Sequence, residues 1–329
     1  MLCEHNKNTT RSGGVFIGIM TLFFERCSSL PPSSAPGDGF RGELTLEAKR
    51  CIILETQGRG DPAIYILEAK KMLQKPFFYD HFTPEDICGM FTPGHFLSIA
   101  AFFGSLGLAL WFSRRLQERT VGKVHIAVAG GVAVMEIIKI SLRVYKGQGP
   151  DDWMPLYFCS LFLFAVWLAL AKPRPLQTTG YAFMTMGGIA ASVFFIFYPT
   201  TSLNMYPIWH PASIHSFVYH WIMCYMGVLV LMKGVYAPRA AHALHYGAFV
   251  LVACFAAYFF NEWLGSNCMF LHSAFGLPFL EDILRANHAA YIIIVSLAQG
   301  VALYWFSFGI YRLIMRIRSK RHERLRLLT

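Results

Sequence analysis

Hydrophobic runs separated by short polar turns dominate the chain after residue 92. Each run is long enough to cross a bilayer, which takes about 20 apolar residues in a helix. The pattern predicts an all-α fold, a polytopic membrane protein built as a bundle of seven transmembrane helices with an extra-membrane N-terminal extension. The predicted helices lie at 94–113, 121–145, 153–171, 179–198, 213–233, 241–263 and 288–315.

The first 92 residues have a different pattern. Val15–Phe24 is apolar but too short to span a membrane, and the turn-rich run Ser28–Gly39 follows it. A signal peptide is the alternative interpretation of this apolar segment. We therefore expect three regions: a partly disordered extension at 1–92, a membrane domain at 93–318, and a basic tail at 319–329.

Composition agrees with this division. Hydrophobic residues make up 55% of the chain and charged residues 15%, whereas a soluble domain usually carries about 25% charged residues. The net charge is +10, yet residues 1–92 hold 10 basic and 11 acidic side chains. The positive excess therefore belongs to the membrane part, where it indicates orientation rather than nucleic-acid binding. The eight cysteines have no spacing typical of metal ligands.

Basic residues are distributed unequally between the two sides of the predicted bundle. One side has 15 of them and the other has three, and the basic side is expected to be cytoplasmic. This places the C-terminus in the cytoplasm and residues 1–92 in the lumen of the endoplasmic reticulum or outside the cell. The 15 are Arg114, Arg115, Arg119, Lys123, Lys172, Arg174, Lys233, Arg239, Arg312, Arg316, Arg318, Lys320, Arg321, Arg324 and Arg326; the three are Arg143, Lys146 and Arg285.

Polar side chains from four predicted helices fall at similar depth in the lumenal half of the bundle. Ionisable groups inside a spanning helix are expensive and are functional candidates by default. We therefore expect a buried polar site that opens toward the lumen. Its members are Glu136, Lys139, Cys159, His215, His220 and Asn261.

A cysteine and a histidine at matching depth suit nucleophilic acyl transfer. A thiol is mostly protonated at neutral pH, and a neighbouring imidazole converts it into the reactive thiolate. His220 matches Cys159 in depth better than His215 does, and the two histidines lie about 140° apart around their helix, so only one readily faces the thiol. Structural roles are the alternative: Glu136 and Lys139 are three residues apart and could simply neutralise each other.

Three blocks around these residues resemble the YwaF-like integral membrane proteins, whose eukaryotic branch is the transmembrane protein 164 group. WMPLYFCSL at 153–161 resembles the family's LPLHLCSI signature, and HSFVYH at 215–220 resembles its histidine-containing fifth-helix motif. NEWLGSNCMFL at 261–271 resembles its Asn…Gly-Ser/Thr-Asn-Tyr-Met-Phe-Leu block. The resemblance covers about 93–318. Tyr157 stands where the motif often has His, and Cys268 where it often has Tyr.

The resemblance implies a phospholipid acyltransferase of the endoplasmic reticulum membrane. An intramembrane cysteine would take a fatty acyl chain from a phospholipid and pass it to a lysophospholipid, including lyso-ether lipids, without a cofactor. Carried over, Cys159 is the nucleophile and His220 or His215 is the base. Glu136, Lys139, Asn261 and Asn267 would form the supporting polar site. The expected partners are these lipids and the bilayer, not nucleic acid.

Three other functions remain open. A hydrolase would use the same mechanism with water as the acceptor. A seven-helix transporter or receptor would have no enzymatic activity, and in a transporter Glu136 and Lys139 would line the substrate path. A haem-binding redox protein that uses membrane histidines is the third alternative.

Overall fold

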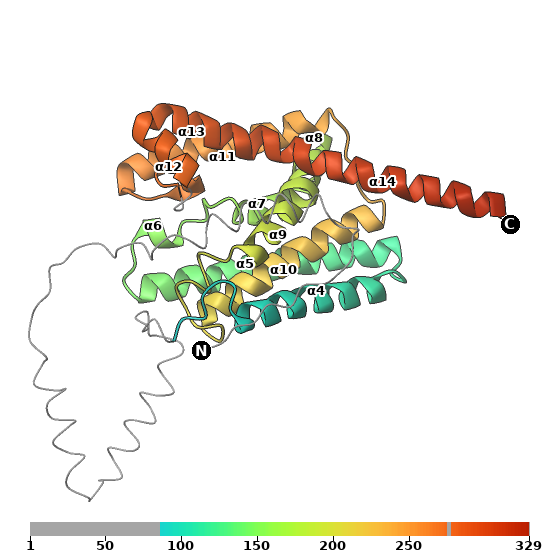
Figure 1. The fold of residues 1–329 in the computed structure, drawn as a ribbon, viewed down its shortest axis with the longest axis horizontal. Coiled ribbons are helices and arrows are strands. Elements are labelled where there is room, and N and C mark those ends of the chain that lie inside the picture. The colour runs from blue at the N-terminus through green and yellow to red at the C-terminus, as the bar shows by residue number, and fades with distance from the viewer. Residues whose placement is uncertain (1–85, 275–277, 329) are drawn as a thin grey trace, which may run out of the picture. The chain divides into compact units, whose positions relative to one another are not determined.

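The computed structural model describes residues 86–274 and 278–328, and no β-strand occurs in these ranges. Figure 1 shows several helices lying lengthwise beside one another. The helices are α4 (Pro93–Ser113), α5 (Glu118–Tyr145), α6 (Pro150–Trp153), α7 (Leu161–Leu168), α8 (Arg174–Ala182), η1 (Phe183–Gly188), α9 (Ile189–Phe197), α10 (Pro211–Met232), α11 (His242–Leu264), η2 (Cys268–Phe270), α12 (Pro278–Ala286), α13 (His288–Leu297), η3 (Ala298–Ala302) and α14 (Leu303–Leu328).

Six helical stretches in the described residues are long and apolar enough to cross a membrane. Two of them are composite, since α8, η1 and α9 join end to end, as do α13, η3 and α14. The all-helical, polytopic character is confirmed. The predicted number of seven spanning helices is wrong for the part of the chain that the structure describes. The six are Pro93–Ser113, Glu118–Tyr145, Arg174–Phe197, Pro211–Met232, His242–Leu264 and His288–Arg321.

The difference lies in the third predicted helix, 153–171. Only α7 is a regular helix there, and its eight residues rise by about 12 Å. Met154 is extended, with φ −60° and ψ 128°, because the proline at 155 disfavours the helical conformation of the residue before it. The irregular backbone that follows packs inside the bundle, where Phe158, Ser160 and Leu161 are buried. Non-helical backbone is tolerated at membrane depth when protein surrounds it.

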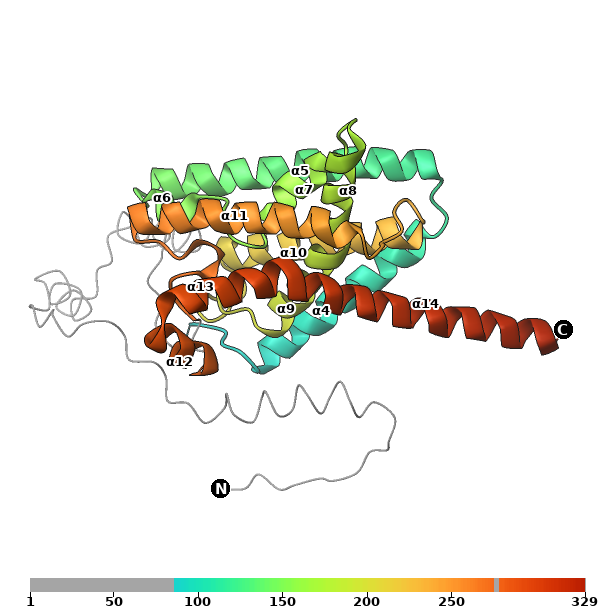
Figure 2. The same ribbon diagram turned by 90° about the horizontal axis from the view of Figure 1, so that it is seen from above.

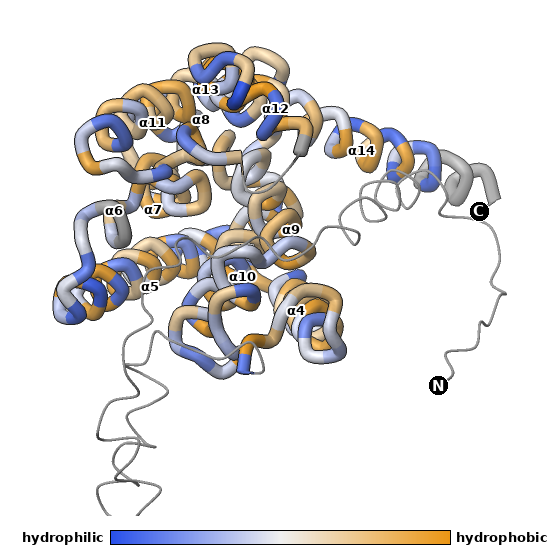
Figure 3. Tube along the Cα trace, turned by 60° about the vertical axis from the view of Figure 1, so that its left-hand side comes forward, coloured by the Kyte–Doolittle hydropathy of each residue, from blue (hydrophilic) through white to orange (hydrophobic). Residues whose placement is uncertain are grey.

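Large apolar side chains cover much of the outer surface of the bundle. Leu97, Leu244, Val252, Phe255 and Trp263 are all more than 65% exposed. Figure 3 shows hydrophobic residues along α10, α11 and α13, and more hydrophilic residues toward the end of α14. Such a surface suits a hydrocarbon environment, since soluble monomers rarely expose contiguous apolar patches of this extent.

The core is tightly packed where α8, η1 and α10 cross their neighbours. A side chain at Gly180 would collide with the backbone of Ala165 and Ala169, and one at Gly227 would collide with the carbonyl oxygen of Met184. Small residues allow helix backbones to approach closely in a membrane. In Figure 2, α5 and α11 run lengthwise with α6 near their ends, and α6 contacts both helices.

The predicted N-terminal extension falls almost entirely outside the described residues, so its character stays a prediction. The membrane domain begins at α4, whose first residue Pro93 follows the N-cap Thr92; the Thr92 side chain accepts a hydrogen bond from the amide of His95. The segment expected as a tail, 319–329, continues α14 as far as Leu328.

Candidate functional site

Cys159 lies at the end of the irregular segment, immediately before the N-cap residue Ser160 of α7. Its thiol is free and partly buried, and it interacts with the adjacent Ser160. Its carbonyl oxygen accepts a hydrogen bond of 3.0 Å from the amide of Phe162. The amino end of a helix carries partial positive charge, which stabilises an anion beside it. The break in the third segment therefore places the thiol at the amino end of α7.

Glu136 and Lys139 of α5 form an ion pair of 2.5 Å. The Glu136 side chain is 4% exposed and that of Lys139 is 21% exposed. Both charges are close enough to act electrostatically on the Cys159 thiol. The structure therefore brings together three of the predicted site residues, and Glu136 and Lys139 contact each other, as their spacing of three residues allows. A charge pair at such depth is costly unless both partners remain.

The His215 side chain of α10 faces α5. Its ring interacts with the backbone of Met135 and with the charge of Lys139. Its Nε2 atom is buried, and no described group makes a well-aligned hydrogen bond to it. Lys139 thus acts electrostatically on both the Cys159 thiol and the His215 imidazole.

The His220 side chain packs toward α9 instead. Its Nδ1 donates a hydrogen bond of 2.7 Å to the carbonyl oxygen of Ser216. Its ring lies flat against Phe195, with 3.8 Å between the ring centroids and 7° between the planes. His220 and His215 still interact electrostatically. The two histidines therefore have different neighbours, as their spacing on the helix predicts.

Tyr219 is a member of the cluster that the sequence analysis missed. Its buried hydroxyl lies beside the Leu163 amide and close enough to Cys159 and Glu136 for electrostatic interaction. The ring stacks on His215 at 5.9 Å. The spacing of four residues from His215 was the available signal, because residues four apart share a helix face. No described group makes a well-aligned hydrogen bond to this hydroxyl.

Asn261 stands at the end of α11 and organises the loop that follows. Its Oδ1 accepts hydrogen bonds from the Cys268 amide at 2.7 Å and the Ser266 hydroxyl at 2.8 Å. Its Nδ2 donates to the Cys268 carbonyl at 2.9 Å. Phe270, two residues after Cys268, is held too, because the Tyr291 hydroxyl donates a hydrogen bond of 2.8 Å to its carbonyl oxygen. The Asn261 side chain therefore fixes the backbone of this loop through hydrogen bonds.

Asn267 supports the same loop. Its Oδ1 accepts from the amides of His272 and Ser273, and its Nδ2 donates to the Ser273 hydroxyl. The loop connects to the site through the Met269 amide, which donates to the Leu156 carbonyl at 3.2 Å, three residues before Cys159. Met269 and Phe270 both have positive φ, a strained conformation that persists only when its surroundings enforce it.

No group of three or more histidine, cysteine or acidic side chains in the described ranges is arranged to hold a metal ion. The cluster is instead composed of one thiol, one imidazole, one phenol and one ion pair. These groups suit proton transfer and nucleophilic attack.

Comparison with known proteins gives one match. A model of the TMEM164 family matches residues 90–310, which is more than half of the chain. No curated protein and no solved structure matches it.

Proposed function

The chain belongs to the TMEM164 family, and from this membership and the geometry around Cys159 we propose that it is a membrane-embedded glycerophospholipid acyltransferase or transacylase. It moves a fatty acyl chain from a phospholipid to a lysophospholipid through a thioester on Cys159. The observation that carries the proposal is the free thiol at the amino end of α7, within electrostatic reach of Lys139, Glu136 and Tyr219.

In the first half-reaction the Cys159 thiolate attacks the ester carbonyl carbon of the donor phospholipid. His215 takes the thiol proton, a role for which its unpartnered Nε2 is suited. The tetrahedral intermediate collapses, the ester C–O bond breaks, and the imidazolium returns the proton to the leaving oxygen. The products are a lysophospholipid and the acylated enzyme.

The second half-reaction reverses these roles. The hydroxyl of the acceptor lysophospholipid gives its proton to His215 and attacks the thioester carbonyl. The C–S bond breaks and the thiolate is protonated by the imidazolium. Water in place of the acceptor gives a hydrolase, so exclusion of water decides which activity is observed. No cofactor enters either half-reaction when a phospholipid is the donor.

The remaining residues position and stabilise the reacting groups. Tyr219 supplies a hydroxyl that donates to the developing oxyanion. Lys139 offsets negative charge at the thiolate, and Glu136 keeps that cation in place. Asn261 and Asn267 hold the loop whose Met269 amide fixes the backbone before Cys159.

The proposed location is the endoplasmic reticulum membrane, with the N-terminus in the lumen and the C-terminus in the cytoplasm. The distribution of basic residues, 15 on one side of the predicted bundle against three on the other, supports the orientation. The choice of the endoplasmic reticulum rests on the family resemblance alone. In this arrangement the irregular third segment, 153–171, connects the two sides of the membrane, although only α7 is a regular helix there.

Transport is the second candidate, and the buried Glu136–Lys139 pair favours it. Ion pairs inside membrane domains often mark substrate or proton paths. Transport and acyl transfer differ in the residue that is essential for activity. Transport depends on Glu136 and tolerates Cys159→Ser, whereas acyl transfer does not tolerate that substitution.

An exchange assay tests the proposal. The purified chain in liposomes receives a phospholipid with an isotope-labelled acyl chain and an unlabelled lysophospholipid, and mass spectrometry follows the label. We expect labelled product from the wild type and from the control Cys254→Ala, whose thiol is buried in the apolar core. Cys159→Ala should give none. Equal transfer by Cys159→Ala would reject the proposal, and labelled free fatty acid alone would assign a hydrolase.

A further inference from the structure

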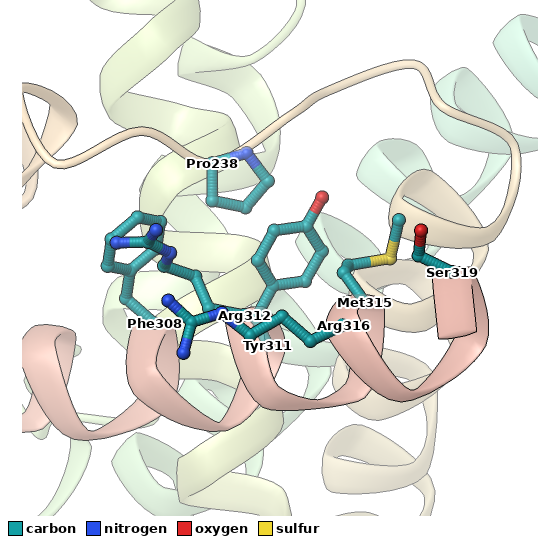
Figure 4. A pocket seen from close by; sticks show the side chains of 7 residues that line it. All are labelled: Pro238, Phe308, Tyr311, Arg312, Met315, Arg316 and Ser319. Atoms are coloured by element: carbon teal, nitrogen blue, oxygen red, sulfur yellow. The ribbon is translucent and has the colours of Figure 1, made fainter.

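A groove beside α14 has no part in the proposed reaction. It is lined by Pro238, from the connection between α10 and α11, and by residues of α14 that include Phe308, Tyr311, Arg312 and Arg316. Its volume is about 400 Å³. In the view of Figure 4 both arginine side chains extend toward Phe308, and Pro238 lies across from them.

The two arginines are unpaired cations on one face of the helix. They are four residues apart, so their side chains are neighbours on the helix surface. Neither forms an ion pair with a described residue, and none of the seven residues that line the groove is acidic. The Arg312 guanidinium lies 5.9 Å from the centre of the Phe308 ring. The groove therefore presents two positive charges above an apolar floor.

The opposite face of α14 indicates the depth of the groove in the membrane. Ile310, Leu313, Ile314 and Ile317 are exposed large apolar residues, and their positions lie roughly 180° from the centre of the groove face at 100° per residue. This apolar stripe extends along the same turns as Arg312 and Arg316. Those turns therefore lie where hydrocarbon meets head groups rather than in open water.

From these observations we infer that the groove binds the head group of an anionic phospholipid. The two guanidiniums hold the phosphate, since arginine donors match phosphate oxygens in pairs. An acyl chain lies along the apolar floor. A zwitterionic lipid fits less well, because it has no net negative charge to balance the two guanidiniums, whereas the carboxylate of a lipid such as phosphatidylserine supplies one. The site is separate from Cys159 and does not depend on the proposed acyl transfer.

The test measures lipid binding in an uncharged detergent, which removes the general attraction of an anionic bilayer surface. Native mass spectrometry counts the phosphatidylserine or phosphatidylcholine molecules, with identical acyl chains, that stay on the full-length chain. The variant R312Q/R316Q removes both groove charges. The matched control R318Q/K320Q removes two charges from the same helix at residues that do not line the groove.

We expect the wild type and the control to prefer phosphatidylserine about tenfold, and R312Q/R316Q to lose that preference. The variant R312K/R316K keeps the two charges but not the paired donors of arginine, and it should retain part of the preference for phosphatidylserine. It serves as the test if R312Q/R316Q does not fold. Equal loss in the control, or no loss in R312Q/R316Q, would overturn the inference. So would full competition by inorganic phosphate, which would identify a site for the free anion.

Discussion

Two groups of buried polar residues differ in how completely their hydrogen bonds are made. Every polar atom of the Asn261 side chain has a partner in the loop after α11. Around Cys159, by contrast, the His215 Nε2 and the Tyr219 hydroxyl are buried without a well-aligned partner. Unsatisfied buried polar atoms are costly. The side chain of the first group is fully bonded within the fold, whereas the second keeps polar atoms without a well-aligned partner, which under the proposed function are available to a substrate.

Removal of the thiol is the largest expected effect on the second group. Cys159→Ala should lower acyl transfer about a thousandfold or more, because no other group in the cluster can form the thioester. Liposome exchange assays measure the rate. Thermal unfolding should remain close to the wild-type curve, since the side chain is small and partly exposed. Wild-type rates in this variant would assign the cluster to another function.

The two histidines provide the next test of the comparison. His215→Ala should reduce the transfer rate about a hundredfold, the usual contribution of a general base. His220→Ala should instead lower the unfolding temperature through the loss of its contact with Phe195 and its bond to Ser216. Rate and unfolding temperature are measured for both variants. A larger rate loss in His220→Ala, with the fold intact, would reverse the assignment of the base.

Asn261 tests the first group. Asn261→Ala leaves the amide and carbonyl of Cys268 without their partner, and we expect a loss of about 2 kcal/mol in the free energy of unfolding. Asn267→Ala is the matched control. Its bonds lie at an exposed position, where water replaces them, so its loss should be smaller. Thermal or denaturant unfolding in detergent measures both, and an unchanged stability for Asn261→Ala contradicts the structural role.

Tyr219→Phe is the smallest change to the reactive cluster. It keeps the ring and its stacking on His215 and removes only the hydroxyl. Loss of one oxyanion donor should slow transfer about a hundredfold, mainly in kcat. A kinetic comparison with the wild type at saturating donor lipid shows it. If kcat is unchanged, the hydroxyl has no role in the reaction.

The sequence predicted the helical membrane fold well because hydropathy measures the property that a bilayer selects. It failed at 153–171, where Pro155 keeps Met154 extended and the regular helix begins only at Leu161. That failure matters, because the break places Cys159 at the amino end of α7. Pro155 was visible in the sequence, yet hydropathy counts it only as one weakly polar position.

The sequence pointed to several residues that lie near Cys159, but it missed Tyr219 and could not give the contacts among them. Helical spacing showed that His215 and His220 face different directions, but the rotation of α10 depends on packing against Phe195 and α5. No single-helix argument supplies that rotation. Asn261 was expected from its depth in the bundle and Asn267 from the resemblance, and their bonds to loop backbone give the physical reason for a supporting role.

The covalent intermediate on Cys159 is the most direct test of the account. Wild type and Cys159→Ala are incubated with an alkyne-tagged phospholipid, quenched, and probed with and without neutral hydroxylamine, which cleaves thioesters. We expect a label on the wild type that hydroxylamine removes and that the variant never acquires. A wild type that stays unlabelled with every phospholipid class, or a label that persists in Cys159→Ala, would contradict it.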